Sequence, residues 1–236
     1  MKKITALLLI FTLFSCTELQ QIAESVVNQP GQSGISDLMI GNGLREALDF
    51  GIDKQVTKLT GTDGFYKNEL VKILLPEELQ KVDKALRTVG LGNLADEGIK
   101  ALNRAAEDAV SEATPIFVNA VKEITFNDVK TILLGTDDAA TQYLTEKTEA
   151  ALYSKFQPVI QNSFGKVGAD QIWSNLINKY NALPLTADVN PDLTDYVTQQ
   201  ALKGVFTMIA VEEKEIRTKT SSRTTTLLQQ VFGLQD

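Results

Sequence analysis

The chain has 236 residues, with 30 acidic and 23 basic side chains, one cysteine and no histidine, and a net charge of −7 at neutral pH. The lack of histidine excludes Ser-His-Asp and Cys-His catalysis and imidazole-ligated metals, so neither a metal nor another cofactor is expected. The acidic surface disfavours nucleic acid as a partner, because phosphate backbones repel negative charge. The chain is long enough for a sizeable core that needs no disulfide.

The N-terminus has the pattern of a lipoprotein signal peptide. Two lysines precede the apolar run 4–14, which is shorter than the roughly 20 residues of a membrane-spanning helix but fits a signal-peptide core. Residues 13–16, LFSC, then resemble a bacterial lipobox, with Phe14 departing from its usual small or β-branched residue. We therefore predict a signal peptide over 1–15 and lipid attachment at Cys16, the alternative being a chance thiol after an ordinary signal peptide.

Lipidation at Cys16 would place the protein in the bacterial cell envelope. Two or more acyl chains suffice for stable anchoring, so the membrane is an expected partner through the lipid. We expect the outer membrane, with the protein facing the periplasm or the cell surface. Residues 16–35 end in a run rich in turn formers, NQPGQSG, and read as a lipidated tether to a domain over 36–236.

The first half of that domain shows helical spacing with one interruption. A helix is predicted from Ser36 or Asp37 until Gly61, because its apolar residues recur at steps of three and four. A short extended passage with alternating apolar residues, 71–75, follows, and Pro76 then suits the first turn of a helix to about residue 89. The apolar residues are Leu44, Leu48, Ile52, Val56 and Leu59 in the helix, and Val71, Ile73 and Leu75 in the passage.

Prolines divide the middle of the domain. The helical pattern over 93–124 contains Pro115, which predicts a kink or two abutting helices. Thr125 and Asp128 are placed to cap a short helix to residue 134. A longer helix opened by 136–138 contains Pro158, a second predicted kink.

The last part of the chain is predicted to form three helices. One runs from residue 169 to about 180, and a linker with two prolines follows it. The stretch 192–233 then carries a long apolar stripe interrupted by charges, and reads as a terminal helix pair. The whole pattern predicts an all-α, single bundle-like domain of about eight helices.

Eight blocks of sequence carry a family resemblance across nearly the whole domain. They are LVKILLPEEL, LNRAAEDAV, PIFVNAV, TDDAATQYL, FQPVI, DYVTQQALKGVF, and EEKEIR followed by RTTTLLQQVFG. In this order they resemble an uncharacterised bacterial family, domain of unknown function 4197. The resemblance implies an all-helical envelope protein, often exported and sometimes lipidated, with no established activity and no site residues to carry over. Where family members tend to have Asn-Pro, this chain has residues 219–222, KTSS, in which Ser221 or Ser222 could cap the last helix.

A first candidate cluster comprises Asn103, Arg104 and Glu107, with Asp108 behind them. Arg104 can pair with Glu107 at three residues' spacing or with Asp108 at four. Such a pair is most often a weak surface contact. The alternatives are a buried ion pair that links two helices and a ligand site built on Asn103 and Arg104.

A second candidate cluster comprises Glu213, Arg217 and Arg223, next to Glu212. Glu213 and Arg217 have the favoured spacing of four residues on a helix. The first interpretation is a structural ion pair that docks the last helix against the long one. The alternative is a cleft in which arginine binds a carboxylated or phosphorylated ligand, or Glu213 acts as a base.

The sequence favours a non-enzymatic module that binds an envelope protein or a small ligand, because the commonest nucleophile and metal chemistries lack their residues. One alternative is a metal-independent enzyme that uses carboxylate and arginine residues on an envelope substrate. The other is a purely structural envelope protein.

Overall fold

The computed structural model describes residues 37–88, 90, 92–167, 169–181 and 192–233. The predicted signal peptide, the lipid attachment at Cys16 and the tether 16–35 lie outside the described residues. Within the described part of the chain the fold is all-α, without a strand. Its helices are α2 (Asp37–Thr60), α3 (Glu77–Thr88), α4 (Gly92–Val110), α5 (Ala113–Lys122), α6 (Phe126–Leu133), α7 (Ala139–Val167), α8 (Ala169–Asn181), α9 (Thr194–Thr218), the 3-10 helix η1 (Thr220–Ser222) and α10 (Thr226–Phe232).

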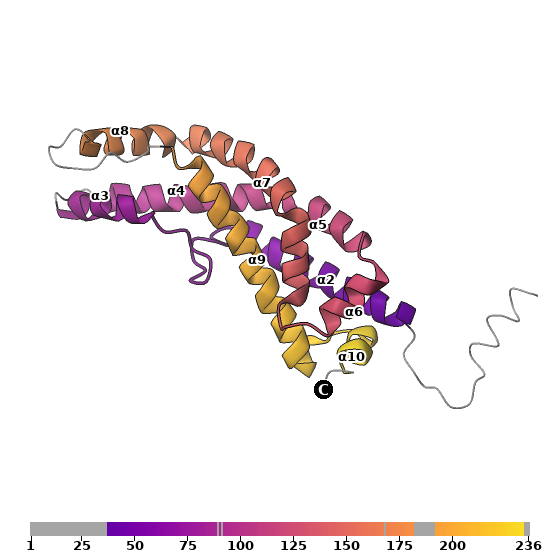
Figure 1. Ribbon diagram of the computed structural model, residues 1–236. Coiled ribbons are helices and arrows are strands. Elements are labelled where there is room, and N and C mark those ends of the chain that lie inside the picture. Colours follow the sequence, from indigo (N-terminus) through magenta and orange to yellow (C-terminus); the bar gives the residue numbers. More distant parts are fainter. Residues whose placement is uncertain (1–36, 89, 91, 168, 182–191, 234–236) are drawn as a thin grey trace, which may run out of the picture. The chain divides into compact units, whose positions relative to one another are not determined.

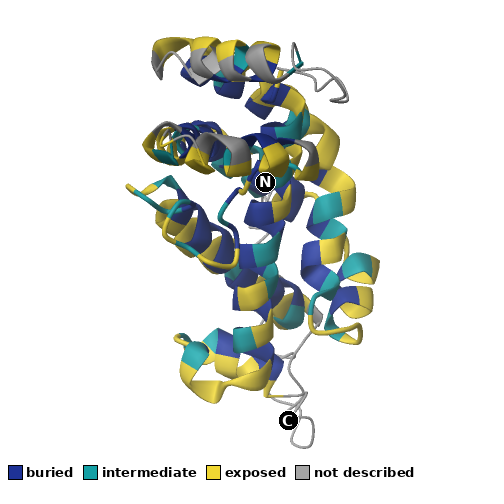
Figure 2. Ribbon diagram, turned by 90° about the vertical axis from the view of Figure 1, so that its left-hand side faces the viewer, coloured by how far each residue is buried: buried dark blue, intermediate teal, exposed yellow. Residues whose placement is uncertain are grey.

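Helix α9 is central to the packing of the domain. It packs against α7, α2 and α4, and α4 and α7 also pack against each other. The apolar stripe expected in this part of the chain is buried, as Val197, Ala201, Val205, Ile209 and Ile216 show. Figure 2 shows the buried residues facing between the helices and the exposed ones facing outward. The all-α prediction is therefore confirmed, and α9 joins most of the other helices to one core.

Helix α5 packs against α2 and α7, and the other four helices pack at the two ends of α4, α7 and α9. Helices α3 and α8 contact α4 and each other, whereas α6 and α10 pack against α2. In Figure 1, α3 and α8 lie at one end and α6 and α10 at the other. The first residues of α2 lie at the end with α6.

The two internal prolines have different effects. Helix α4 ends at Val110 and α5 begins at Ala113, so Pro115 falls in the first turn of a new helix. A missing N–H costs little there, because first-turn donors lack intrahelical partners anyway. Of the two alternatives predicted at Pro115, the pair of abutting helices is confirmed and the kink does not form, which raises the described α-helices to nine. By contrast, α7 continues through Pro158 and curves along its length.

Two short helices have threonine caps. The Thr125 hydroxyl accepts from the Asp128 backbone N–H, and Asp128 accepts from the Thr125 N–H, a reciprocal capping box at the start of α6. This cap is confirmed. The cap predicted at Ser221 or Ser222 is wrong, because both lie in η1 and the hydroxyl of Thr225 caps α10 by accepting from Leu228 N–H at 3.2 Å.

The capping box makes the stability of α6 pH-dependent. The side-chain and backbone hydrogen bonds from Thr125 lower the pKa of Asp128 from 3.8. Its stabilisation is therefore fully present above pH 3.8 and is lost as the pH falls through the lower, folded-state pKa. We expect Asp128→Asn to cost about 1 kcal/mol at pH 7 and to reduce the loss of stability between pH 4 and pH 2, as measured by urea unfolding.

Asp49→Asn is the control, because the pKa of Asp49 is shifted in the opposite direction to that of Asp128. Burial raises the pKa of Asp49 against the smaller, opposing effect of Lys122, so the charged form of Asp49 is disfavoured in the fold. Its removal should not reduce acid sensitivity. Equal acid profiles for the Asp128 variant and the unmodified protein would show that the capping box does not contribute.

Candidate functional site

Glu213 lies on α9 at the N-terminal end of α7. One carboxylate oxygen accepts from Ala140 N–H at 2.9 Å, and the other accepts from the N–H and the hydroxyl of Thr141, both at 2.8 Å. Ala140 and Thr141 are the second and third residues of α7, so their N–H groups have no partner inside the helix. Glu213 therefore caps α7 from a helix 72 residues away in sequence, and its charge is favourable at the positive end of the helix dipole.

Arg217 lies one turn further along α9 and binds a helix C-terminus, that of α6. Its guanidinium donates to Glu213 at 2.9 and 3.0 Å, and to the carbonyls of Ile132 at 2.8 Å and Leu133 at 3.3 Å. Those carbonyls close α6, where the helix dipole favours a cation. The ion pair thus joins the C-terminus of α6, the N-terminus of α7 and the side of α9.

Arg223 is buried at the end of α9. It donates to the carbonyls of Ile216 at 2.9 Å and Arg217 at 2.8 Å, while its own carbonyl accepts from Gln229 of α10 at 3.1 Å. Arg223 therefore donates hydrogen bonds to carbonyls in the last turn of α9, and these bonds connect the end of α9 to the turn before α10. Glu213 and Arg217 form the ion pair one turn earlier in the helix.

Glu212 points to a different neighbour from Glu213. Its carboxylate accepts from Lys54 and Gln55 of α2, both at 2.7 Å. Glu212 is buried and Gln55 is buried with it, so the charge is compensated by a cation and an amide. Adjacent carboxylates on α9 thus bind two different helices, α2 and α7.

A small cavity lies beside the Glu213–Arg217 pair. Its volume is about 20 Å³, and its walls are mostly apolar, including Leu48, Ile209 and Phe232. One water molecule needs roughly 10–15 Å³ measured in this way. The cavity therefore has room for about one water, and an organic substrate does not fit next to this ion pair.

Asn103 holds the segment between α2 and α3 onto α4. Its side-chain oxygen accepts from Ile73 N–H, and its amide donates to the carbonyls of Ile73 and Ile99, all at 2.8 Å. Asn103 and Ile73 are both buried. The side chain thus satisfies both backbone groups of a residue in extended chain, as a neighbouring strand would. The alternating burial of Val71, Ile73 and Leu75 predicted from the sequence is confirmed.

Arg104 and Glu107 act on the same segment one turn away. Glu107 is buried and accepts from Phe65 N–H at 3.1 Å and from Arg104 at 2.7 Å. Arg104 also pairs with Asp63 at 2.5 Å. The backbone of Asp63 lies in the left-handed region, with a φ of +66°. A hydrogen bond from Lys67 and the nearby charge of Arg104 lower the pKa of Asp63. The first cluster therefore fixes the turn after α2. The side chains of Arg104 and Glu107 are already bound to each other and to residues of that turn.

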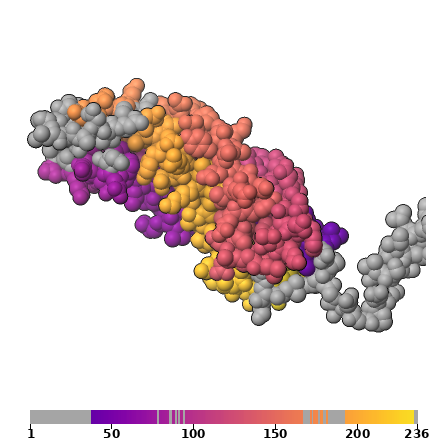
Figure 3. Space-filling model, in the orientation of Figure 1, coloured from indigo at the N-terminus to yellow at the C-terminus, as the bar shows by residue number. Residues whose placement is uncertain are grey.

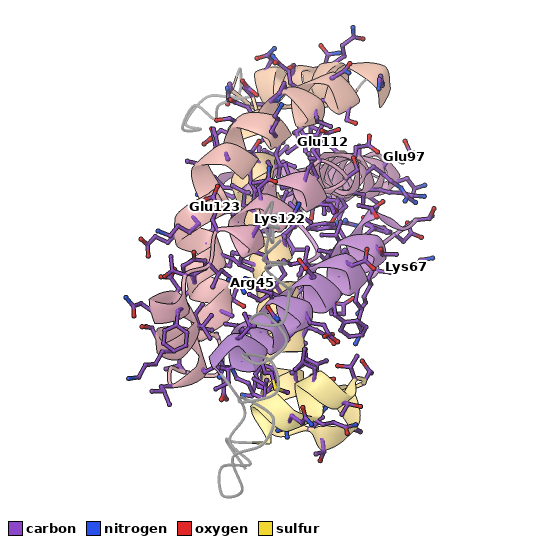
Figure 4. All side chains as sticks on the ribbon, turned by 90° about the vertical axis from the view of Figure 1, so that its right-hand side faces the viewer. Arg45, Lys67, Glu97, Glu112, Lys122 and Glu123 are labelled. Carbon is purple, nitrogen blue, oxygen red and sulfur yellow. The ribbon has the colours of Figure 1, made fainter. Side chains whose placement is uncertain are left out.

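Two side chains on these elements, Asp108 and Arg45, make contacts that the sequence does not indicate. Asp108 accepts a hydrogen bond from Ser163 of α7, so Arg104 pairs with Glu107 at three residues' spacing. Arg45 donates to the Ile124 carbonyl just after α5 at 2.6 Å, and Figure 4 shows Arg45 below the end of α5, where Lys122 and Glu123 lie. No local spacing signals such contacts, because the partners are 55 and 79 residues apart.

A surface groove runs between α7 and α9. One wall has residues 145, 149 and 153 of α7 and the other has residues 199, 203 and 207 of α9, each set at steps of four along one side of its helix. Leu202 and Phe206 belong to the core and contribute the apolar floor. The groove encloses about 720 Å³, far more than the internal cavity, and opens to solvent.

A second, more polar surface hollow of about 550 Å³ lies between α4 and α7. Glu107, Asp108, Ser163 and Lys166 are among its lining residues. In the described residues no group of three or more acidic or cysteine side chains is arranged to hold a metal ion. None of the helices described is long and apolar enough to cross a membrane.

Comparisons with known proteins identify the family but no characterised relative. The model of the family described as "Protein of unknown function (DUF4197)" matches residues 34–233, which includes both clusters and the groove. No curated protein matches the chain, and no solved structure does. The chain belongs to the DUF4197 family.

Proposed function

We propose that the chain is a lipid-anchored bacterial envelope protein whose helical domain is a non-enzymatic binding module. The lipobox at Cys16 supports the anchor. The observation that carries the binding role is the groove between α7 and α9, because it is the largest of the three hollows described above and has an apolar floor with polar walls. Its occupant is a segment of a partner protein.

The chemistry of the groove suits a peptide segment. Its walls carry uncharged hydrogen-bonding side chains, among them Thr145, Gln199 and Thr207, with one charge on each side in Glu149 and Lys203. Amides and hydroxyls can bind the polar groups of a backbone, and the apolar floor can accept one or two side chains of the partner. Two turns of helix line each wall, a length of about 12 Å. The groove therefore matches a short helix or extended segment laid along it.

The second charged cluster supports this proposal because Glu213, Arg217 and Arg223 bind the ends of helices. An active site requires ionisable groups that converge on a space large enough for substrate. Both oxygens of Glu213 already accept from donors of α7 and α9, and the neighbouring cavity holds about one water. A role for Glu213 as a base would first require these contacts to break.

Photo-crosslinking in the native envelope tests the groove. Ala150 lines it, whereas Ala151 is exposed on the same helix and does not. A photoreactive amino acid placed at Ala150 should give an adduct with a discrete partner protein, and the same group at Ala151 should not. Ala150→Trp, which fills the groove, should also abolish the adduct formed from a photoreactive group at Gln200 on the opposite wall.

Equal adducts at both alanines, or none at either, would contradict the groove as the partner site. A small molecule retained by the unmodified protein in native mass spectrometry and lost in Ala150→Trp would instead make the occupant a small ligand. Ala151→Trp is the matched control for both experiments, because it adds the same bulk one residue away from the groove.

A further inference from the structure

Helix α6 presents an apolar stripe to solvent. Phe126, Lys130 and the capping residue Leu134 are spaced by four residues and lie along one side of the helix. All three are exposed, and Leu134 has 78% of its surface accessible. The buried residues Val129 and Ile132 form the opposite side, which packs on the domain. The exposed apolar side chains are therefore not needed for the core.

The first turn of α2 adds two more exposed apolar side chains next to this stripe. Leu38 is 72% exposed and Met39 is also exposed. A Cβ at Gly41 would lie 3.8 Å from Val129, and Arg45 further along reaches the carbonyl of Ile124. The two segments thus run in opposite directions, which places the start of α2 toward Leu134. Figure 3 shows the indigo start of α2 adjoining the magenta atoms of the α5 and α6 region.

This apolar surface lies where the chain enters the domain from its anchor. Residues 16–35 make up 20 residues of chain, which span at most about 70 Å when fully extended. A tether of that length keeps the entry point of the domain close to the bilayer, so even a weak contact there is favoured by a high effective concentration. The stripe on α6 and the first turn of α2 lie beside this entry point.

We propose that this surface, formed by Leu38, Met39, Phe126, Lys130 and Leu134, rests on the bilayer that holds the lipid of Cys16. This inference rests on the proposed anchor. Leucine and phenylalanine side chains insert into the boundary between headgroups and acyl chains, and a lysine between them can extend its ammonium to the headgroups. The domain would then be held with the α6 end toward the membrane, and the groove between α7 and α9 would have a fixed orientation.

Apolar contact provides the attraction. The chain has a net charge of −7, so an anionic bilayer repels it as a whole and a neutral one does not. Another pair of exposed leucines, Leu70 and Leu74, lies on the segment after α2. Helix α2 has 24 residues and spans about 36 Å, so this second pair lies well away from the entry point. Leu70 therefore gives a matched control with similar exposure.

Tryptophan quenching by brominated lipids tests the proposal on the mature lipidated protein. The only native tryptophan, Trp173, is buried in α8 and gives a constant background. Leu134→Trp and Leu70→Trp are each reconstituted into phosphatidylcholine vesicles, with and without bromine on the acyl chains. The emission added by Leu134→Trp should be lost on the brominated vesicles, and that added by Leu70→Trp should remain.

Flotation of the vesicles tests the lipid anchor separately from the docking surface. Protein that does not float refutes the anchor, and the docking surface falls with it. Protein that floats while the Leu134→Trp emission persists refutes the docking surface alone. Equal quenching at both positions also refutes it, because the domain would then have no preferred side. Emission at Leu134→Trp that neither bromine nor aqueous iodide quenches would mean that a second copy covers the surface, which overturns the lipid proposal.

Discussion

Replacing Glu213 by alanine should lower the free energy of unfolding by about 4 kcal/mol, the usual cost of removing one partner of a buried ion pair. The change leaves the Arg217 charge buried with fewer acceptors, and it removes the acceptor of the Ala140 and Thr141 N–H groups. For a domain of this size the melting temperature should fall by roughly 10 °C. Glu213→Gln should cost less, because an amide oxygen can still accept from α7.

The measurement is denaturant unfolding followed by circular dichroism, with Glu215→Ala as the control. Glu215 pairs with Lys219 at the same spacing of four residues, at 2.6 Å, but the side chain of Glu215 is 39% exposed and that of Lys219 57% exposed. A surface pair of this kind contributes less than about 1 kcal/mol. If the Glu213 and Glu215 variants were destabilised equally, the pair would not join the three helices as described. Unchanged stability with loss of partner binding would place Glu213 in a functional site.

Replacing Asn103 by alanine should cost about 3 kcal/mol. Ile73 would keep a buried N–H and a buried carbonyl without their side-chain partner, and each unsatisfied group costs roughly 1–3 kcal/mol. The segment between α2 and α3 should detach locally before the domain unfolds, because among the described residues its remaining side-chain hydrogen bonds to α4 are those of Glu107 and Arg104. Hydrogen exchange at the Ile73 amide should therefore accelerate more than the global loss of stability requires.

Asn119→Ala on α5 is the matched control, because Asn119 is exposed and its removal should change stability by less than about 0.5 kcal/mol. Exchange at the Ile73 amide that stays as slow as in the unmodified protein would show that Asn103 does not hold this segment.

The helices could be predicted because their signals are local. The repeating apolar positions of α9, the stop at Gly61 and the capping pair Thr125 and Asp128 each depend on residues within a few positions of one another. The number of helices was harder to predict from the sequence. Pro115 is compatible with a kink or with a first turn, and the break two residues earlier settles which of the two forms.

The last helix shows a similar limit. Serine and threonine have similar preference for a cap, so the sequence 219–225 offers several candidates. Ser221 and Ser222 are taken into η1, and the cap falls to Thr225 because α10 packs on α2 from residue 226 onward. Tertiary packing therefore chose among positions that are equivalent by local propensity.

The charged clusters could be predicted only within each helix. The spacings Arg104 to Glu107 and Glu213 to Arg217 indicate pairing, and both ion pairs form. Their other partners lie far away in sequence: Asn103 binds Ile73 across 30 residues, and Glu212 binds Lys54 across 158. Helix ends supplied by α6 and α7 become partners only when the domain folds. The sequence thus identifies the charged side chains, and the packing of the helices determines which backbone and side-chain groups they bind.

The anchor at Cys16 is the claim on which the location of the protein and its orientation at the membrane both rest. Mass spectrometry of the protein extracted from its own membrane tests it directly. The account predicts that the mature chain begins at Cys16 and that its N-terminal peptide carries two or three acyl chains. An unmodified peptide that spans Ser15 to Thr17 would contradict the account.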